Sequence, residues 1–126
     1  MIQIKRFQSK KGAAKSGKSG FFNLAYAQIC QQEKVEEFVD FPTDGLDLKN
    51  YVKMDCAKAG ISTVYDLYAV VNHYGSLNGG HYTACGKNID GEWYNFNDSS
   101  VSSAARERVQ SSAAYVLFYR RREDMS

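Results

Sequence analysis

The C-terminal half of the chain consists of short β-prone segments separated by turn sequences. Val64 to His73 is rich in valine and tyrosine, side chains that pack well on a pleated surface. Three further segments of this kind follow, at residues 81–87, 92–96 and 115–120. Residues 88–91, Asn-Ile-Asp-Gly, lie between the first two and are typical of a hairpin turn. We therefore expect a mainly antiparallel sheet in an α+β fold.

The N-terminal half gives weaker signals. Alternation of apolar and polar residues predicts a short strand over residues 2–7. Residues 21–41 are ambiguous, because the first part has helical spacing while Val35 to Phe41 alternates like a strand; we interpret the second part as a strand. Pro42 is expected to end that strand, and Asp44 to cap a short helix that extends to Val52.

Length and composition limit the class of protein. A chain of 126 residues is one domain, and 44% hydrophobic with 24% charged residues is the balance of a folded protein. No apolar run approaches the ~20 residues of a membrane span, and the charged start at Lys5 and Arg6 does not resemble a secretory signal. We therefore expect no membrane association and an intracellular location, cytoplasmic or nuclear. The three cysteines lack CxxC spacing, so we expect free thiols, no metal site and no cofactor.

Positive charge is concentrated near the N-terminus. The residues before Glu33 contain six Lys or Arg and no acid, whereas the rest contains ten bases and fourteen acids. Residues 8–20 are rich in Lys, Gly, Ser and Ala, and we interpret them as a flexible basic loop. Nucleic acid is not an expected partner, because the basic stretch is short and lacks interleaved aromatic residues.

The basic loop also contains a letter-for-letter match to the phosphate-binding loop, GxxxxGK[ST], at residues 12–19. Four polar residues separate it from the preceding strand, and Gly20 would weaken the helix start that holds phosphates. No strand ending in Asp supplies a magnesium ligand. We interpret the match as an accident of composition.

A histidine and a carboxamide flank the predicted 88–91 hairpin. If the turn is type I and ends in a left-handed glycine, its loop has three residues and Asn97 lies opposite Thr83. His81 and Asn97 then project from the same face, about 7–8 Å apart between their Cα atoms. A two- or four-residue loop would turn Asn97 to the other face.

An imidazole held by an amide can act as a general base, because the acceptor fixes the tautomer and leaves the second ring nitrogen free. Asn97 would be that acceptor, and the neighbouring Asp98 could add negative charge nearby. The pattern alone leaves open a simpler interpretation. In that interpretation His81 is an ordinary surface residue of a strand, and Asn97-Asp98 belongs to a turn.

Several motifs in order along the chain add weight to the first interpretation. They are Ile4-Lys5-Arg6-Phe7; Val39-Asp40-Phe41-Pro42; the stretch from Tyr65 to Gly75 followed by Gly79-Gly80-His81-Tyr82-Thr83-Ala84; Trp93 to Ser99; and Ala114 to Tyr119. Together they closely resemble the "LKRF" strand, the "FP" segment, the histidine box, the W-x-x-F-[DN]-D-S segment and the closing strand of ubiquitin-specific proteases. The resemblance covers nearly the whole chain apart from the basic loop.

The resemblance implies the palm half of a papain-like cysteine peptidase that cleaves the isopeptide bond after the C-terminal glycine of ubiquitin. By the family's motif His81 is the base, Asn97 orients it, and Asp98 matches an assisting acidic position. The expected partners are ubiquitin and ubiquitinated proteins.

The resemblance also assigns substrate-binding residues. Gly79 and Gly80 would let the glycines of the ubiquitin tail pass close to the backbone, and Tyr82 would line the channel. Residues 73–78 resemble a loop that covers this tail, and the glycines of residues 72–80 predict a mobile loop. His73 is then a loop residue and not a second base.

The sequence departs from the family in lacking its nucleophile. Cys30 and Cys56 have no Asn-Thr-Cys context, and Cys85 is four strand residues from His81, about 13 Å away. The zinc-binding cysteines of the family are also missing. The chain alone is therefore expected to be inactive, with the cysteine-bearing half of the catalytic domain as its partner. The alternative is a binding module that holds ubiquitin without cutting it.

Overall fold

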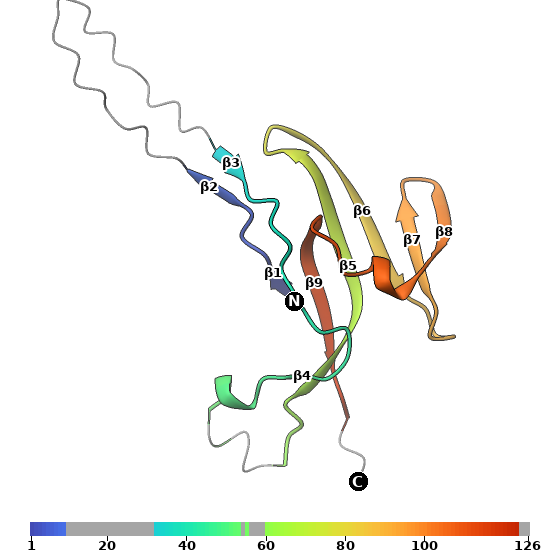
Figure 1. Ribbon diagram of the computed structural model, residues 1–126. Coiled ribbons are helices and arrows are strands. Elements are labelled where there is room, and N and C mark those ends of the chain that lie inside the picture. The colour runs from blue at the N-terminus through green and yellow to red at the C-terminus, as the bar shows by residue number, and fades with distance from the viewer. Residues whose placement is uncertain (10–31, 54, 56–59, 124–126) are drawn as a thin grey trace, which may run out of the picture.

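A curved antiparallel sheet is the main element of the protein (Figure 1). The computed structural model describes residues 1–9, 32–53, 55 and 60–123. In spatial order the main sheet contains β1 (Ile2–Gln3), β9 (Ala114–Arg121), β5 (Val64–Ser76), β6 (Gly79–Lys87), β7 (Trp93–Asn97) and β8 (Ser100–Ala104), and β4 (Leu46–Asp47) also pairs with β5. A separate two-stranded sheet contains β2 (Phe7–Ser9) and β3 (Gln32–Lys34). The predicted mainly antiparallel fold is confirmed.

The core lies on one face of the sheet. Val70 on β5 is directly opposite Leu117 on β9 and Cys85 on β6, and all three side chains are buried. Phe41 and Val109, from segments outside the strands, complete the buried cluster. Each fully buried side chain of this size stabilises the fold by about 1.5–3 kcal/mol relative to exposure. The long pairing of β5 with both neighbours therefore anchors the sheet that carries the site.

Arg6 links the start of β9 to the irregular segment after β3 from inside the protein. The residue is 1% exposed, and its guanidinium donates to the carbonyl oxygens of Ala114, at 2.6 Å, and of Val35 and Glu37, both at 2.9 Å. Burial lowers the pKa of Arg6, and the charge of Glu36 opposes this effect. These bonds hold residues 35–37 as an irregular segment, so the predicted strand over 35–41 is wrong.

The predicted helix over 44–52 is also largely wrong. Leu46–Asp47 is strand β4, and only the 3₁₀ turn η1 (Lys49–Tyr51) is helical. The Asp44 carboxylate does not cap η1; it accepts hydrogen bonds from Thr43 and Arg106. Pairing with β5 has overridden the local helical preference.

The glycine-rich stretch 72–80 is not a loop. β5 continues to Ser76 and β6 begins at Gly79, so only Leu77 and Asn78 connect them. Gly75 and Gly80 are opposite each other in this hairpin. A Cβ on Gly75 would lie 2.8 Å from the carbonyl oxygen of Gly79, so glycine allows the two strands to approach here.

Strands β3 and β8 and the 3₁₀ turn η2 (Arg106–Arg108) were not predicted. The predicted basic loop over residues 8–20 starts too early, since Gln8 and Ser9 belong to β2 and pair with β3. Residues 10–20, the phosphate-loop pattern at 12–19, and Cys30 and Cys56 lie outside the described residues. In the described part of the chain, no helix has the length and apolar character needed to cross a membrane.

Candidate active site

A three-residue turn sets the register of β6 and β7. Asn88 N–H donates to the carbonyl of Glu92 at 2.8 Å, and Gly91 has a φ of +87°. The strands then pair from Lys87 opposite Trp93 to Ala84 opposite Phe96. The predicted turn and register are therefore confirmed.

This register brings the two predicted side chains together. One step beyond the last pair, Asn97 falls opposite Thr83, two residues from His81. The Nε2 atom of His81 lies 2.6 Å from Oδ1 of Asn97, and both residues are exposed. Since the amide oxygen accepts, Nε2 carries the proton and donates it. Nδ1 then has the lone pair that can accept a proton.

Asp98 lies next to this pair but not against the ring. It begins a two-residue turn between Asn97 and Ser100, which pair across β7 and β8. Its φ of +50° lies in the left-handed region, which Asp tolerates better than most residues. Among the described residues no hydrogen bond joins its carboxylate to His81. The structure thus unites His81 with Asn97 and leaves Asp98 as a nearby exposed charge.

His73 is a buried strand residue rather than the predicted loop residue. It belongs to β5 and is 3% exposed. Its ring centroid is 4.8 Å from that of Tyr82, 5.6 Å from that of Phe7 and 5.8 Å from that of Tyr115. Burial, and secondarily the charge of Lys34, lowers the pKa of His73.

The two glycines before His81 differ in their surroundings. A Cβ on Gly79 would meet nothing within 4 Å, so the space beside it is open. A Cβ on Gly80 would lie 2.3 Å from Nε2 of His73 and 2.6 Å from the carbonyl oxygen of Tyr74. Gly80 is thus required by packing within the chain. Tyr82, also on β6, is 56% exposed.

Comparisons with known proteins identify the family of the chain. The family model described as "Ubiquitin carboxyl-terminal hydrolase" matches residues 1–119. The chain belongs to this family. It is 56% identical over 91 residues to ubiquitin carboxyl-terminal hydrolase 10 of Arabidopsis thaliana, and 48% identical over 94 residues to ubiquitin carboxyl-terminal hydrolase 4 of Rattus norvegicus. These matches cover 71% and 74% of the chain but 10% of each relative.

Solved structures match the fold of this hydrolase-family chain. It is similar to a chain of the SAGA Ubp8/Sgf11/Sus1/Sgf73 DUB module bound to ubiquitin aldehyde, with a TM-score of 0.70 and 34% identity over 96% of this chain and 24% of that one. A similar chain in the yeast SAGA DUB module gives the same TM-score and identity, over 96% and 22%. The fold is therefore that of part of a ubiquitin-specific protease catalytic domain.

Cys85 does not have the surroundings of a hydrolase nucleophile. Cys85 is on β6, the strand that carries His81, and its side chain is buried in the hydrophobic core. The sulfur lies 3.9 Å from Nδ2 of Asn72 and 3.9 Å from Oδ1 of Asn95. Burial raises the pKa of Cys85, and the bond from Asn72 only partly opposes this. A buried thiol with a raised pKa is mostly protonated and unreactive.

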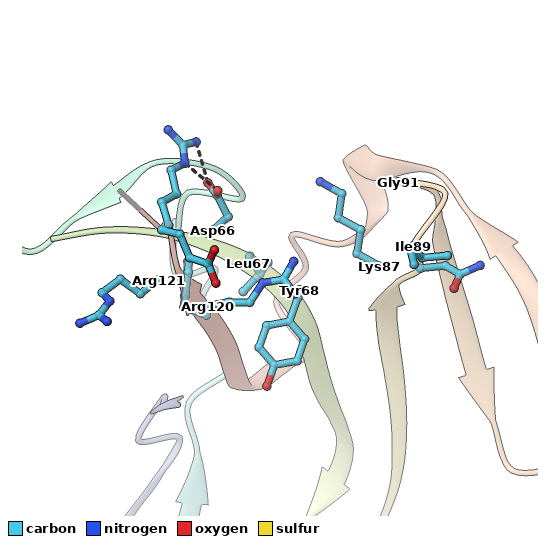
Figure 2. A pocket seen from close by; sticks show the side chains of 12 residues that line it. Asp66, Leu67, Tyr68, Lys87, Ile89, Gly91, Arg120 and Arg121 are labelled. Atoms are coloured by element: carbon cyan, nitrogen blue, oxygen red, sulfur yellow. Dashed lines mark hydrogen bonds and ion pairs between the residues drawn. The ribbon is translucent and has the colours of Figure 1, made fainter. Parts of the chain in front are cut away.

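A pocket of about 1120 Å³ lies at the end of β6 that is remote from His81 (Figure 2). Its lining includes Lys87, Tyr68 and Arg120. The carboxylate of Asp66, which is labelled in Figure 2, accepts two hydrogen bonds of 2.7 Å from the guanidinium of Arg122. The pocket does not include His81 or Asn97 and takes no part in the site.

The sequence pattern did not predict that two residues of β5 lie close to the candidate base. Tyr74 is directly opposite His81 across β5 and β6, and His73 is opposite Tyr82. The signal was a possible two-residue turn at Leu77-Asn78. Tyr74 and His81 are equally far from this turn along the chain, and so are His73 and Tyr82. The three glycines obscured it, because glycine is more common in loops than in paired strands. Within the described residues, no group of three or more His, Cys, Asp or Glu side chains could hold a metal ion.

Proposed function

We propose that this chain supplies the base of a deubiquitinase, a thiol-dependent peptidase that hydrolyses the bond after the C-terminal glycine of ubiquitin. The hydrogen bond between His81 and Asn97 is the observation that carries the proposal. It leaves Nδ1 of an exposed imidazole as the proton acceptor, which a cysteine peptidase requires beside its thiol.

The roles follow from the proton positions. His81 takes the thiol proton at Nδ1, and the thiolate attacks the carbonyl carbon of the terminal glycine. The imidazolium then gives the proton to the leaving amine as the carbon–nitrogen bond breaks. Water, deprotonated by the same ring, hydrolyses the thioester. Asn97 keeps the ring in one orientation throughout, and Asp98 stabilises the imidazolium through its charge.

The nucleophile lies, in this proposal, in another part of a longer protein. Because the chain spans about a tenth of the length of its Arabidopsis and rat relatives, most of such a protein lies outside it. The buried thiol of Cys85 supports this view. The proposed partners are ubiquitin, ubiquitinated proteins and the cysteine-bearing half of the domain. We propose that the protein acts in the cytoplasm or nucleus, and that it uses no cofactor and binds no membrane. Ubiquitin is bound by the similar protein in the solved ubiquitin aldehyde complex.

The substrate channel is assigned to Gly79, Gly80 and Tyr82. The open space beside Gly79 and the exposed ring of Tyr82 support this assignment. At Gly79 a backbone with no side chain allows an extended tail to approach closely, as the glycines of ubiquitin would need. The space beside Gly80 is occupied by His73, so Gly80 would contribute only its backbone.

The test is hydrolysis of a fluorogenic ubiquitin C-terminal amide by the full-length gene product. His81→Ala should reduce kcat by about 10³-fold or more, and Asn97→Ala by about 10–100-fold, since orientation contributes less than the base. Asn95→Ala is the matched control, because Asn95 is on the same face of β7 and its amide oxygen faces Cys85 rather than His81. Ubiquitin binding without hydrolysis by the wild type would instead favour the non-catalytic binding module.

A further inference from the structure

We propose that His73 is a positioning residue for His81: its buried ring fixes the first residues of β6 and thereby the orientation of the base. The proposal rests on the function proposed above. His73 lies on β5, where it is directly opposite Tyr82. Its side chain projects from the face opposite to that of His81, so we expect its effect to pass through the backbone of β6.

The ring of His73 occupies the space beside Gly80, the residue before the base. Its Nε2 and Cε1 atoms lie 2.3 Å and 2.9 Å from the position of a Cβ on Gly80. Only a glycine can therefore lie against this ring. The contact leaves the backbone just before His81 little room to move toward β5.

The same ring contacts the residue after the base. The ring centroids of His73 and Tyr82 are 4.8 Å apart, at an interplanar angle of 56°. Because side chains alternate along a strand, Gly80 and Tyr82 share one face and His81 projects from the other. The His73 ring thus packs against β6 on the face opposite His81, where it contacts the residues before and after the base, Gly80 and Tyr82.

His73 is itself held from outside the β5–β6 hairpin. The ring of Phe7 on β2 and the ring of Tyr115 on β9 pack against it. Its carbonyl oxygen accepts from Nζ of Lys34 on β3 at 2.7 Å, and its N–H donates to the carbonyl of Ala113 at 2.9 Å. Strands β2 and β9 therefore hold the side chain of His73, and Lys34 on β3 holds its backbone.

A histidine at this position leaves one buried polar atom unpaired among the described residues. Its Nδ1 atom is buried and has no hydrogen-bond partner in the described part of the chain. An aliphatic side chain would avoid that unpaired atom. A flat ring can stand both against Gly80 and beside Tyr82, which a branched aliphatic chain cannot do equally well.

The test compares His73→Ala with Val70→Ala in the full-length gene product. Val70 is on the same strand and is 0% exposed, but it faces Leu117 and Cys85, away from the start of β6. His73→Ala should lower kcat by about 10–100-fold and change KM by less than about 2-fold, because small displacements of a catalytic group lower the reaction rate strongly. Val70→Ala should lower the melting temperature by a similar amount without this loss of kcat.

Amide hydrogen exchange of the peptide that covers residues 79–84 gives a readout independent of hydrolysis. His73→Ala should speed exchange there, and Val70→Ala should not. Unchanged exchange together with an unchanged kcat would overturn the proposal. If the wild type hydrolyses nothing, the proposed function fails, while the exchange data still decide whether His73 fixes this segment.

Should His73→Ala not fold, His73→Leu keeps most of the apolar volume and removes the flat ring. The same two measurements then apply, with an expected loss of kcat at the lower end of the range, about 10-fold. A Leu variant equal to the wild type in both measurements would show that any apolar side chain suffices, which contradicts a specific role of the ring.

Discussion

The Nε2 atom of His81 and the Oδ1 atom of Asn97 are 2.6 Å apart although 16 residues separate them in the chain. Neither residue is buried, so the pair is held by the hairpin that delivers it and not by surrounding side chains. The geometry of the β6–β7 turn is therefore what orients the ring.

The adjacent glycines should respond differently to the same substitution. Gly80→Ala places a Cβ against the Tyr74 carbonyl, which is backbone and cannot move aside, so we expect a loss of about 1–3 kcal/mol in the free energy of unfolding. Gly79→Ala meets open space and should change it by less than about 0.5 kcal/mol. Urea denaturation measures both. If Gly79 lines the channel, its alanine variant should raise KM for ubiquitin substrates while keeping this stability.

The charge of Asp98 can be separated from its backbone conformation. Asn tolerates a φ of +50° as well as Asp does, so Asp98→Asn removes the charge without new strain. We expect stability within about 0.5 kcal/mol of the wild type. If the carboxylate stabilises the imidazolium, kcat should fall by about 2–10-fold. A kcat equal to that of the wild type would leave Asp98 with a purely structural place in the turn.

Cys85 should be slow to react with thiol reagents. Burial raises its pKa, so little thiolate forms near neutral pH, and the sulfur is shielded from solvent. Iodoacetamide should modify Cys85 at least about 10-fold more slowly in the native chain than in 8 M urea, as followed by peptide mass spectrometry. A cysteine-reactive ubiquitin probe should also leave Cys85 unlabelled. Stoichiometric labelling by the probe would make Cys85 a nucleophile and refute its assigned core position.

The buried histidine should make the fold sensitive to acid. The pKa of His73 is lowered in the folded chain, so below the unfolded value of about 6.5 the unfolded chain binds the proton preferentially. Its contribution to stability is therefore complete above about pH 6.5 and is lost as the pH falls through the folded pKa. The groups that contact it are Lys34 on β3, Tyr82 on β6, and Phe7 and Tyr115 on β2 and β9. Urea titrations between pH 8 and 5 should show this loss in the wild type and a smaller one in His73→Leu.

The ion pair of Asp66 and Arg122 should contribute modestly at the far end of the sheet. The hydrogen bond from Arg122 lowers the pKa of Asp66, so the stabilisation is present above the unfolded value of about 4 and disappears as the pH falls through the folded pKa. Both side chains are partly exposed, and water and salt weaken the attraction. Arg122→Lys keeps the charge but loses the two-pronged geometry. A small fall in melting temperature at pH 7, which vanishes near pH 2, is the expected result.

The local chemistry of the β6–β7 turn allowed the site to be predicted from the sequence. Asp90 accepts from the N–H of Glu92 at 2.9 Å and Gly91 adopts positive φ, and these preferences act within a few residues. One correct loop length then determined which face Asn97 occupies. The site was thus predictable because its register depends on neighbours in the chain.

The errors arose where distant segments determine the structure. Residues 35–41 alternate like a strand, yet Arg6 binds the carbonyl oxygens of Val35 and Glu37, and no strand in the described part of the chain pairs with this segment. β8 contains mainly serine and alanine, and it forms because β7 presents a free edge to pair with. The position of His73 depended on reading the glycines of residues 72–80 as partners across a hairpin, which no single-segment pattern reveals.

The place of β9 in the sheet has a consequence for synthesis on the ribosome. It is the last strand along the chain but lies between β1 and β5, and Arg6 reaches its first residue. Strand β1 therefore has no partner in the main sheet until β9 has left the exit tunnel. The β6–β7–β8 meander, by contrast, pairs only between neighbours in the sequence. Nascent chains should thus form the hairpin that carries His81 before β9 pairs with β1 and β5.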